Sequence, residues 1–191
     1  MINRESEKKE AYFNRWMNEI KSGNQQAFSE IYKEFAPRIY GYFRIQLKNE
    51  SDIQDLMQLV FLTIWRSAKS YHAESSLSSW IFGIARHKLL DYLRQQYKVK
   101  TWDISDIESM EIESEALEQD FTEDLITEIT ISNALDALPP SYAELLYLVL
   151  KESMSYKEIS YLLKIPIGTV KSRMYQAKIH LKKQLQMEGG R

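Results

Sequence analysis

The sequence predicts an all-α fold in which two small helical domains are joined by an acidic, flexible linker. Apolar residues recur at helical spacing on both sides of this linker, and no segment shows the sustained alternation bounded by hairpin turns that indicates a sheet. The charges are segregated as well. Residues 1–100 hold sixteen Lys and Arg against eleven Asp and Glu, residues 101–150 hold thirteen acidic residues and no basic one, and residues 151–191 hold nine basic residues against three acidic ones. We therefore expect domains at residues 1–100 and 129–191, with the linker at residues 101–128.

The rest of the composition limits the class of protein. A chain of 191 residues with 44% hydrophobic content suffices for one domain or two small ones. The absence of cysteine excludes disulfides and thiolate metal sites, and the three histidines at positions 72, 87 and 180 are scattered, so we expect no metal and no cofactor. The first ten residues are too polar for a signal peptide and no apolar run reaches membrane length. These features predict a cytoplasmic protein without membrane insertion.

Apolar stretches predict the helices of the N-terminal domain in order. The first, residues 12–20, precedes a break at residues 22–24, and the second, residues 28–35, is expected to stop at Pro37 because proline disrupts helix interiors. Residues 39–47 follow. Ser51 or Asp52 can then cap a long helix with an apolar stripe over residues 53–65. A polar loop at residues 71–78 precedes a last helix with apolar positions over residues 80–93.

The linker region has the most biased composition of the chain. Residues 101–130 hold eleven acidic residues and no basic one, and close like charges repel and extend a chain, so much of this segment should be flexible in the free protein. A helix is expected around residues 129–138, ended by Pro139 and Pro140. A further helix at about residues 141–150 leads into the last forty residues.

Those last residues predict two short helices joined by a tight turn. Ser155 and Glu158 form a capping-box pattern, so a helix should start at Tyr156. The chain should turn at residues 164–166, since Pro166 suits a helix entry, and a second helix begins at Ile167 or Gly168. Its apolar positions recur at spacings of four, three and four residues and form one stripe: Val170, Met174, Ala177 and Leu181.

The remaining surface of this second helix is cationic and rich in hydroxyl groups. Its residues are Thr169, Lys171, Ser172, Arg173, Tyr175, Gln176 and Lys178. A helix of this size fits the DNA major groove, with its first turns facing base edges and phosphates. An ordinary helical hairpin with a solvated basic face is the alternative.

Two sets of motifs resemble the sigma factors of bacterial RNA polymerase. The segments ALDALPP at residues 134–140, SYKEIS at 155–160 and IGTVKSRMYQA at 167–177 are similar to sigma region four. The segments AFSEIY at 27–32, DLMQLVF at 55–61 and WIFGIARHKLLDYLR at 80–94 resemble the core of region two. The extracytoplasmic-function (ECF) group of the sigma-70 family keeps only these two regions and is the best fit. The resemblance covers about residues 24–97 and 130–186.

The resemblance implies three binding surfaces. The helix at residues 52–65 would dock on the clamp helices of the beta-prime subunit of core RNA polymerase, with the beta subunit as a further contact. The docking positions are Asp55, Gln58, Phe61 and Trp65. The loop at residues 71–78 and the helix after it would recognise and melt the minus-ten element of promoter DNA, by the residues Tyr71, His72, Trp80, Arg86, Lys88 and Arg94. The last long helix would read the minus-thirty-five element, by the residues Gly168, Thr169, Lys171, Ser172, Arg173, Tyr175 and Gln176.

Each of these roles has a structural alternative. Phe61 and Trp65 can be core residues, Trp80 can be a core anchor at a helix start, and Arg86 can form an internal ion pair with Asp91 or Asp55. Tyr71, His72 and Trp80 can either stack on a base or form the wall of its pocket. The chain also departs from the family pattern. Leu59 stands where many relatives have Glu, and His87, Ser160 and Gln176 stand where Asn, Ala and Arg are usual.

The sequence thus predicts a non-enzymatic sigma factor that binds core polymerase and directs promoter recognition. The group is commonly restrained by an anti-sigma factor, which the resemblance implies as a further partner. A conventional helix-turn-helix regulator that binds operator DNA without polymerase is the alternative, but it needs no module like region two. An enzyme built on the acidic residues at positions 103–128 is disfavoured, because no His, Lys or Gly-rich loop accompanies those carboxylates.

Overall fold

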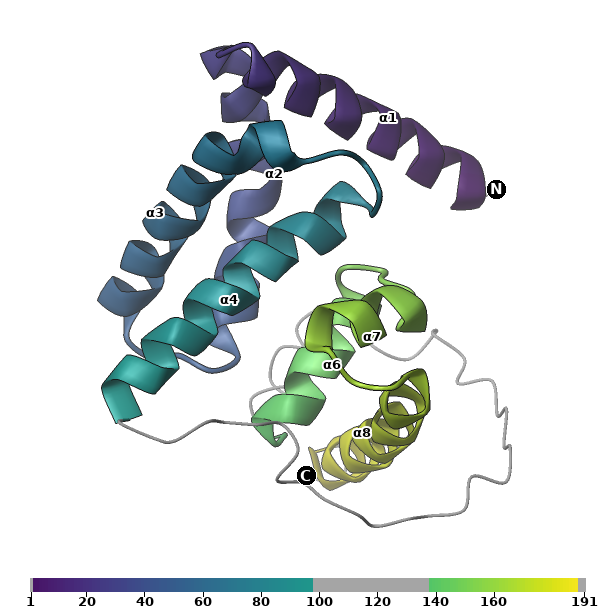
Figure 1. Cartoon of the computed structure of the whole chain (residues 1–191). Coiled ribbons are helices and arrows are strands. Elements are labelled where there is room, and N and C mark those ends of the chain that lie inside the picture. Colours follow the sequence, from purple (N-terminus) through teal and green to yellow (C-terminus); the bar gives the residue numbers. More distant parts are fainter. Residues whose placement is uncertain (1, 98–137, 189–191) are drawn as a thin grey trace. The chain divides into compact units, whose positions relative to one another are not determined.

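The computed structural model describes residues 2–97 and 138–188, and every regular element among them is helical (Figure 1). The chain divides into two compact units, residues 1–101 and 102–191, each of which is described by itself. The all-α fold is therefore confirmed. The expected acidic linker and the helix around residues 129–138 lie outside the described residues. Among the described helices, none combines the length and apolar character needed to span a membrane.

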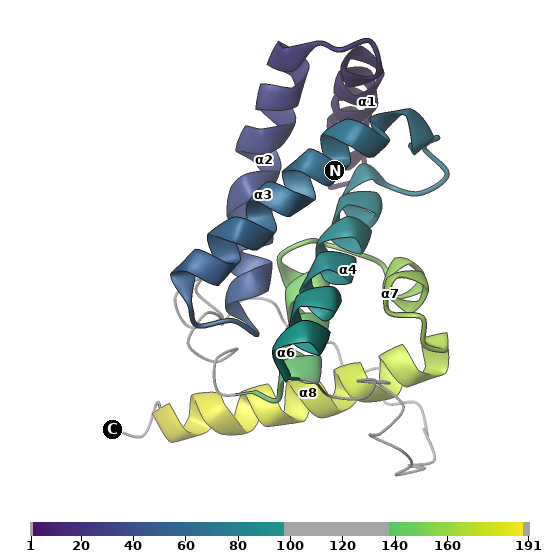
Figure 2. The ribbon, with the colours of Figure 1, turned by 60° about the vertical axis from the view of Figure 1, so that its left-hand side comes forward.

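The N-terminal unit consists of helices α1 (Ile2–Lys21), α2 (Gln25–Arg44), α3 (Glu50–Ser67) and α4 (Leu77–Tyr97), with a short 3-10 turn η1 (Ala68–Ser70) after α3. Helix α1 packs on α2, and α3 packs on both α2 and α4 (Figures 1 and 2). Aromatic rings join these helices. The Phe13 and Phe35 centroids lie 5.2 Å apart, and those of Tyr42 and Phe82 lie 5.4 Å apart. The first pair joins α1 to α2, and the second joins α2 to α4.

The expected break at Pro37 is wrong, because α2 runs through this residue to Arg44. Proline removes one backbone hydrogen bond and costs about 3 kcal/mol in a helix interior. The apolar residues on both sides of Pro37 nevertheless lie on one buried face, and their burial against the neighbouring helices outweighs this cost. The buried residues of the face are Ala27, Ile31, Phe35, Ile39, Tyr42 and Phe43. Pro37 itself is exposed, so its ring displaces no core side chain.

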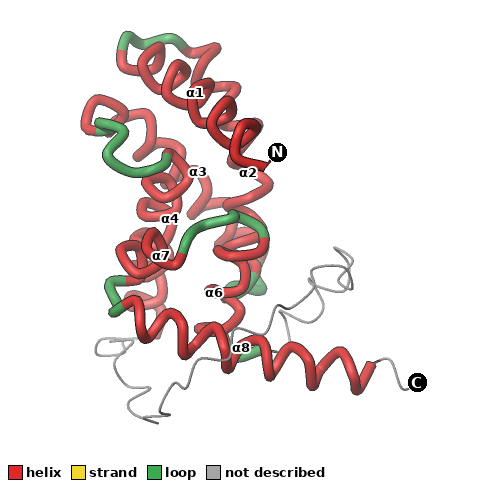
Figure 3. Tube along the Cα trace, turned by 90° about the vertical axis from the view of Figure 1, so that its right-hand side faces the viewer, coloured by secondary structure: helices red, strands yellow, loops and turns green. Residues whose placement is uncertain are grey.

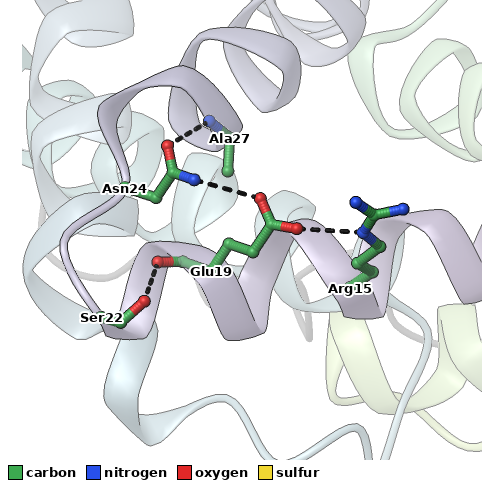
Figure 4. Close-up of polar contacts among 5 residues, drawn as sticks. All are labelled: Arg15, Glu19, Ser22, Asn24 and Ala27. Carbon is green, nitrogen blue, oxygen red and sulfur yellow. Dashed lines mark hydrogen bonds and ion pairs between the residues drawn. The ribbon is translucent and has the colours of Figure 1, made fainter.

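Asparagine side chains cap the N-termini of α2 and α3. The Asn24 Oδ1 atom accepts hydrogen bonds from the backbone N–H groups of Gln26 and Ala27, at 2.9 and 3.2 Å, after the predicted break. Figure 4 shows that Glu19 of α1 supports this cap, since one carboxylate oxygen accepts from Asn24 Nδ2 and the other from Arg15. Helix α3 begins after Asn49, whose side chain accepts from the Ser51 N–H at 3.0 Å. The expected cap at Ser51 or Asp52 is thus wrong by two or three residues.

The C-terminal unit consists of α6 (Pro140–Leu150), α7 (Tyr156–Leu163) and α8 (Ile167–Glu188) in the part of the chain that the structure describes. Helices α6 and α7 both pack on α8, and only helices and loops appear along the described trace (Figure 3). The predicted capping box of Ser155 and Glu158 is confirmed, and so are the start at Tyr156 and the second start at Ile167. Lys164 makes the turn in the left-handed conformation, with φ 57°. The predicted apolar stripe of α8 is buried throughout.

Candidate functional site

The first turns of α8 present a cationic face. Lys171 and Ser172 are exposed, and Thr169, Arg173 and Gln176 are half-buried beside them. The face is kept outward because Val170, Met174 and Ala177 anchor the opposite side of the helix in the core of the unit. The Ser172 hydroxyl donates to the Thr169 carbonyl oxygen at 3.1 Å, so it lies close to the helix surface. The candidate DNA-reading residues therefore share one accessible surface.

The same surface begins with backbone groups that face open space. A Cβ atom added to Gly168 would meet nothing within 4 Å, so the first turn of α8 is open to a neighbouring molecule. The first N–H groups of a helix lack intrahelical acceptors and carry partial positive charge, which suits a phosphate. Tyr175 on α8 and Tyr161 on α7 are also exposed, the latter at 82%. Tyr161 is not among the binding residues predicted from the sequence, where the only indication is that this aromatic residue lies off the buried stripe of α7.

The outer face of α3 carries an apolar patch between polar residues. Asp55 and Gln58 are exposed as the docking prediction requires, and Leu59 and Leu62 beside them are 48% and 43% exposed. Tyr32 of the neighbouring α2 is exposed as well. We call Tyr32, Asp55, Gln58, Leu59 and Leu62 the α3 patch. Large apolar side chains at this exposure, rimmed by polar groups, are typical of a protein-binding surface.

Phe61 and Trp65 lie on the flank of this patch. Phe61 is only 4% exposed, with its ring centroid 4.5 Å from that of Tyr32. Trp65 is half-buried and its ring lies 5.1 Å from that of Phe28. These contacts favour a supporting role in which Phe61 holds the Tyr32 ring in place, and their docking role stays a prediction. Leu59 and Leu62 could have been found in the sequence, because both lie off the buried stripe of α3.

The loop between η1 and α4 encloses a pair of aromatic rings. Tyr71 is buried, its ring centroid lies 5.3 Å from that of Trp80, and Trp80 is half-buried at the start of α4. His72 is exposed. The Tyr71 hydroxyl donates to Asn14 Oδ1 at 2.9 Å and lies 3.3 Å from the Ser75 carbonyl oxygen. Of the two roles open to Tyr71, this burial favours the wall of a base pocket over a stacking platform.

Burial also changes the acidity of the Tyr71 hydroxyl. Removal from water disfavours the phenolate, and the nearby Glu10 carboxylate adds like-charge repulsion, which together raise the pKa of Tyr71 to about 12. The group is therefore a neutral hydrogen-bond donor at physiological pH.

The basic residues of α4 differ in exposure. Arg94 is exposed and pairs with Asp91 at 3.2 Å, while Lys88 is half-buried. Exposed pairs of this kind contribute at most about 1 kcal/mol, so Arg94 can exchange its partner for a phosphate. Arg86 is only 8% exposed, which favours a role inside the domain. His87 Nε2 also lies 3.2 Å from Asp91.

The described residues hold no group of three or more His, Asp or Glu side chains that could bind a metal ion. The candidate residues instead form three surfaces: the first turns of α8, the α3 patch, and the loop at residues 71–76 with α4. The last two belong to the N-terminal unit, where α3 and α4 pack side by side. Each surface offers cations, hydrogen-bond donors or apolar area for binding.

Comparison with protein families gives two matches in the same chain. The family model described as Sigma-70 region 2 matches residues 31–99, and the model described as Sigma-70, region 4 matches residues 129–181. The matched residues include the α3 patch and the loop in the first case and α7 with the first turns of α8 in the second. Helix α1 lies entirely before the first matched segment.

Characterised relatives match along most of the chain. The ECF RNA polymerase sigma factor SigW of Bacillus subtilis is 26% identical over 176 residues, covering 88% of this chain and 94% of that protein. The ECF RNA polymerase sigma factor SigM of the same organism is 28% identical and covers 80% and 91%. Both alignments thus cover at least four fifths of this chain and nine tenths of the relative.

Solved structures with a similar fold are known. CnrH, in a complex with the cytosolic domain of CnrY, superposes with a TM-score of 0.63 at 18% identity, covering 92% of this chain and 98% of that chain. The sigma factor RpoE from Bartonella quintana, solved with the anti-sigma factor NepR, gives a TM-score of 0.61 at 22% identity and covers 83% and 96%. At these identities the likeness concerns the fold.

Proposed function

This chain belongs to the ECF group of the sigma-70 family, and we propose that it binds core RNA polymerase and directs it to specific promoters. The observation that carries the proposal is the presence of both sigma regions in one chain and in the family's order, each with exposed residues at the proposed binding positions. Since core polymerase acts in the bacterial cytoplasm, the proposal places the chain there. The polymerase supplies the chemistry, and this chain supplies recognition.

The α3 patch is the proposed docking surface for the beta-prime clamp helices. Its two leucines provide apolar area that gains free energy when water is removed, at about 25 cal/mol per Å². Asp55 and Gln58 provide the polar rim that fixes orientation. Because Leu59 replaces the family's Glu, this patch relies more on apolar contact than on charge. Contact with the beta subunit is proposed from family membership alone.

Promoter DNA is the second proposed partner. The first turns of α8 suit the major groove of the minus-thirty-five element, where Lys171 or Arg173 can contact guanine or a phosphate and Gln176 can pair with adenine. The loop at residues 71–76 suits an unpaired base of the minus-ten element, with Tyr71 and Trp80 as the wall and His72 at the exposed rim. Lys88 and Arg94 of α4 are placed to hold the phosphates around it.

Two units that each bind DNA weakly bind a promoter more tightly when they are part of one chain. Once one unit binds its promoter element, the covalent connection through the linker keeps the second unit at a high local concentration near the other element. A regulator that binds operator DNA through α8 alone would not need the α3 patch, which favours the sigma-factor function.

Regulation by an anti-sigma factor is also proposed. CnrH and RpoE were each solved with a bound partner, which for RpoE is the anti-sigma factor NepR. A partner that covers the exposed leucines of the α3 patch would compete directly with the clamp helices.

Run-off transcription tests this function. Purified chain and core polymerase are incubated with fragments of the source genome, and transcripts are mapped with and without the chain. We expect discrete start sites that depend on the chain. A failure to bind core polymerase, combined with retained binding to specific duplex DNA, would support the operator-binding alternative.

A further inference from the structure

Helix α1 holds both ends of the loop at residues 71–76. At the loop's first residue, Lys21 Nζ donates to the Tyr71 carbonyl oxygen at 2.7 Å, and the Tyr71 hydroxyl donates to Asn14 Oδ1 at 2.9 Å. Directly after the loop, at the first residue of α4, the Leu77 N–H donates to Glu10 Oε1 at 2.7 Å. These contacts join residues 50 to 67 positions apart in the sequence, so local preferences of the loop do not create them.

The three α1 side chains lie along one side of the helix. Glu10 and Asn14 are four residues apart and Lys21 follows seven residues later, which places all three on one helical face. The Glu10 carboxylate also satisfies an N–H at the start of α4, one of the donors that a helix cannot pair internally. Helix α1 therefore influences where α4 begins, and Trp80 lies on that first turn.

The loop adopts a backbone conformation that its own residues disfavour. Ala73 has φ 57°, in the left-handed region that alanine rarely enters because its Cβ approaches the carbonyl oxygen. Such strain persists only where surrounding contacts determine the conformation, and it is common at binding sites. The hydrogen bonds from α1 are contacts of this kind.

The aromatic wall of the loop is held from the same side. Lys21 Nζ lies 5.9 Å from the centroid of the Tyr71 ring, and the Trp80 ring packs against that ring from α4. Tyr71 is thus fixed by its carbonyl group, its hydroxyl group and the face of its ring. A pocket for an unstacked base needs a wall that does not move when the base arrives.

We propose that α1 acts as a clasp that holds residues 71–76 in the shape required to capture an unstacked promoter base, with Glu10, Asn14 and Lys21 as its positioning residues. The inference rests on the proposed function of the loop and extends it to a helix that precedes the matched sigma segment. None of the three residues needs to touch DNA. Their effect is transmitted through the loop backbone and Tyr71.

The direction in which one substitution changes DNA affinity distinguishes the clasp from a purely electrostatic effect. Glu10→Ala removes a negative charge, which by itself strengthens binding to DNA. The clasp predicts the opposite, because the Leu77 N–H loses its acceptor and the loop its anchor. Glu10→Gln keeps an oxygen acceptor without the charge and should retain function. Arg15→Ala is the matched control on α1, since the exposed Arg15 pairs within its own helix with half-buried Glu19 among the contacts described.

The experiment uses the full chain with core polymerase and a promoter from which the wild type initiates. Two affinities are measured: for the duplex upstream element, and for a single-stranded oligonucleotide that carries the non-template strand of the minus-ten element. Permanganate reactivity of unpaired thymines reports promoter opening. For Glu10→Ala we expect a loss of roughly tenfold in oligonucleotide affinity and opening, the size expected for one anchoring hydrogen bond, with duplex affinity unchanged. Glu10→Gln and Arg15→Ala should match the wild type.

A second variant guards against loss of folding. If Glu10→Ala lowers the helical content of the chain, Lys21→Met is tested in the same way against Lys21→Arg, which keeps a donor for the Tyr71 carbonyl. A positioning role leaves the salt dependence of binding unchanged, whereas a direct phosphate contact by Lys21 lowers the slope by about one. Unchanged oligonucleotide affinity and opening in a folded variant would overturn the clasp. A wild type that directs no initiation would instead overturn the proposed function.

Discussion

Ser155 and Glu158 satisfy each other at the start of α7. The Glu158 N–H lies 3.3 Å from the Ser155 hydroxyl oxygen, and the Glu158 carboxylate accepts from the Ser155 N–H at 2.9 Å. Two donors that the helix cannot pair internally are therefore satisfied by one pair of side chains. Helix α7 has only eight residues and packs directly on α8, so its start determines how the reading helix is supported.

Removal of this cap should destabilise the C-terminal unit. We expect Ser155→Ala to lower its free energy of unfolding by about 1 kcal/mol, the usual cost of losing an N-cap side chain. Ser155→Asp keeps an acceptor for the Glu158 N–H and serves as the control. Urea unfolding followed by circular dichroism measures the difference. Equal stability of Ser155→Ala and the wild type would mean that the cap contributes nothing in this context.

The α3 patch predicts a separation between stability and polymerase binding. Leu62→Asp changes a side chain that is already 43% exposed, so we expect a change in stability within about 0.5 kcal/mol. A charge placed at the centre of an apolar contact should instead reduce affinity for core polymerase at least about tenfold. Tyr12→Ser, at an exposed aromatic residue of α1, is the control. Fluorescence anisotropy with labelled chain measures the affinity, and an unchanged value would exclude Leu62 from the docking surface.

The signals that lie close together in sequence allowed the best predictions. The helix-turn-helix could be predicted to within one residue, because the capping box, Pro166 and the apolar stripe of α8 act within one or two helical turns. The prediction that a helix stops at Pro37 was wrong for the opposite reason. The free energy that carries α2 through proline comes from packing against other helices, and no local pattern contains it.

Exposure was harder to predict than helix position. Phe61 belongs to the docking motif of the family but is buried against Tyr32, while the exposed large apolar residues of α3 are Leu59 and Leu62. Buried and docking stripes look alike in sequence, so only the packed structure separates them. The contacts of Glu10 and Lys21 with the loop could not be predicted either, because they depend on where α1 lies against residues distant in sequence.

Lys164 offers a test of the turn in the helix-turn-helix. This lysine adopts φ 57° at the end of α7, where glycine is the favoured residue because it has no Cβ. We expect Lys164→Gly to raise the free energy of unfolding of the C-terminal unit by roughly 0.5–1 kcal/mol. Lys164→Ala removes the same charge but keeps the Cβ, so it should give no gain. A thermal unfolding midpoint that rises equally for both variants would assign the effect to charge.

Lys171 should act through the phosphate backbone or a guanine. Its removal in Lys171→Ala should weaken binding to the duplex upstream element and, if the contact is to a phosphate, lower the slope of log affinity against log salt by about one. Lys182 is the matched control, since it is exposed on the same side of α8 about 16 Å further along the helix. Lys182→Ala should leave most of the affinity in place. Weakening at one target sequence but not at others would assign Lys171 to a base.

Tyr71 predicts a loss of stability of the N-terminal unit in alkali. Its pKa of about 12 in the folded protein lies above the ordinary value of 10.0, so the fold favours the protonated form. The corresponding stability is present below pH 10 and is lost as the pH rises towards 12. Tyr71→Phe lacks the hydroxyl bonds to Asn14 and Ser75, which should cost about 1 kcal/mol at neutral pH.

A comparison of the wild type with Tyr71→Phe isolates the ionisation of the Tyr71 hydroxyl. Tyr40, whose pKa is also raised by its hydrogen bond to Glu50, is present in both proteins and cancels in the comparison. We therefore expect the stability difference between the wild type and Tyr71→Phe to shrink across this alkaline range when measured by urea unfolding at a series of pH values. A difference that stays constant would show that Tyr71 ionises as freely in the folded chain as in the unfolded one, which its burial between α1 and Trp80 argues against.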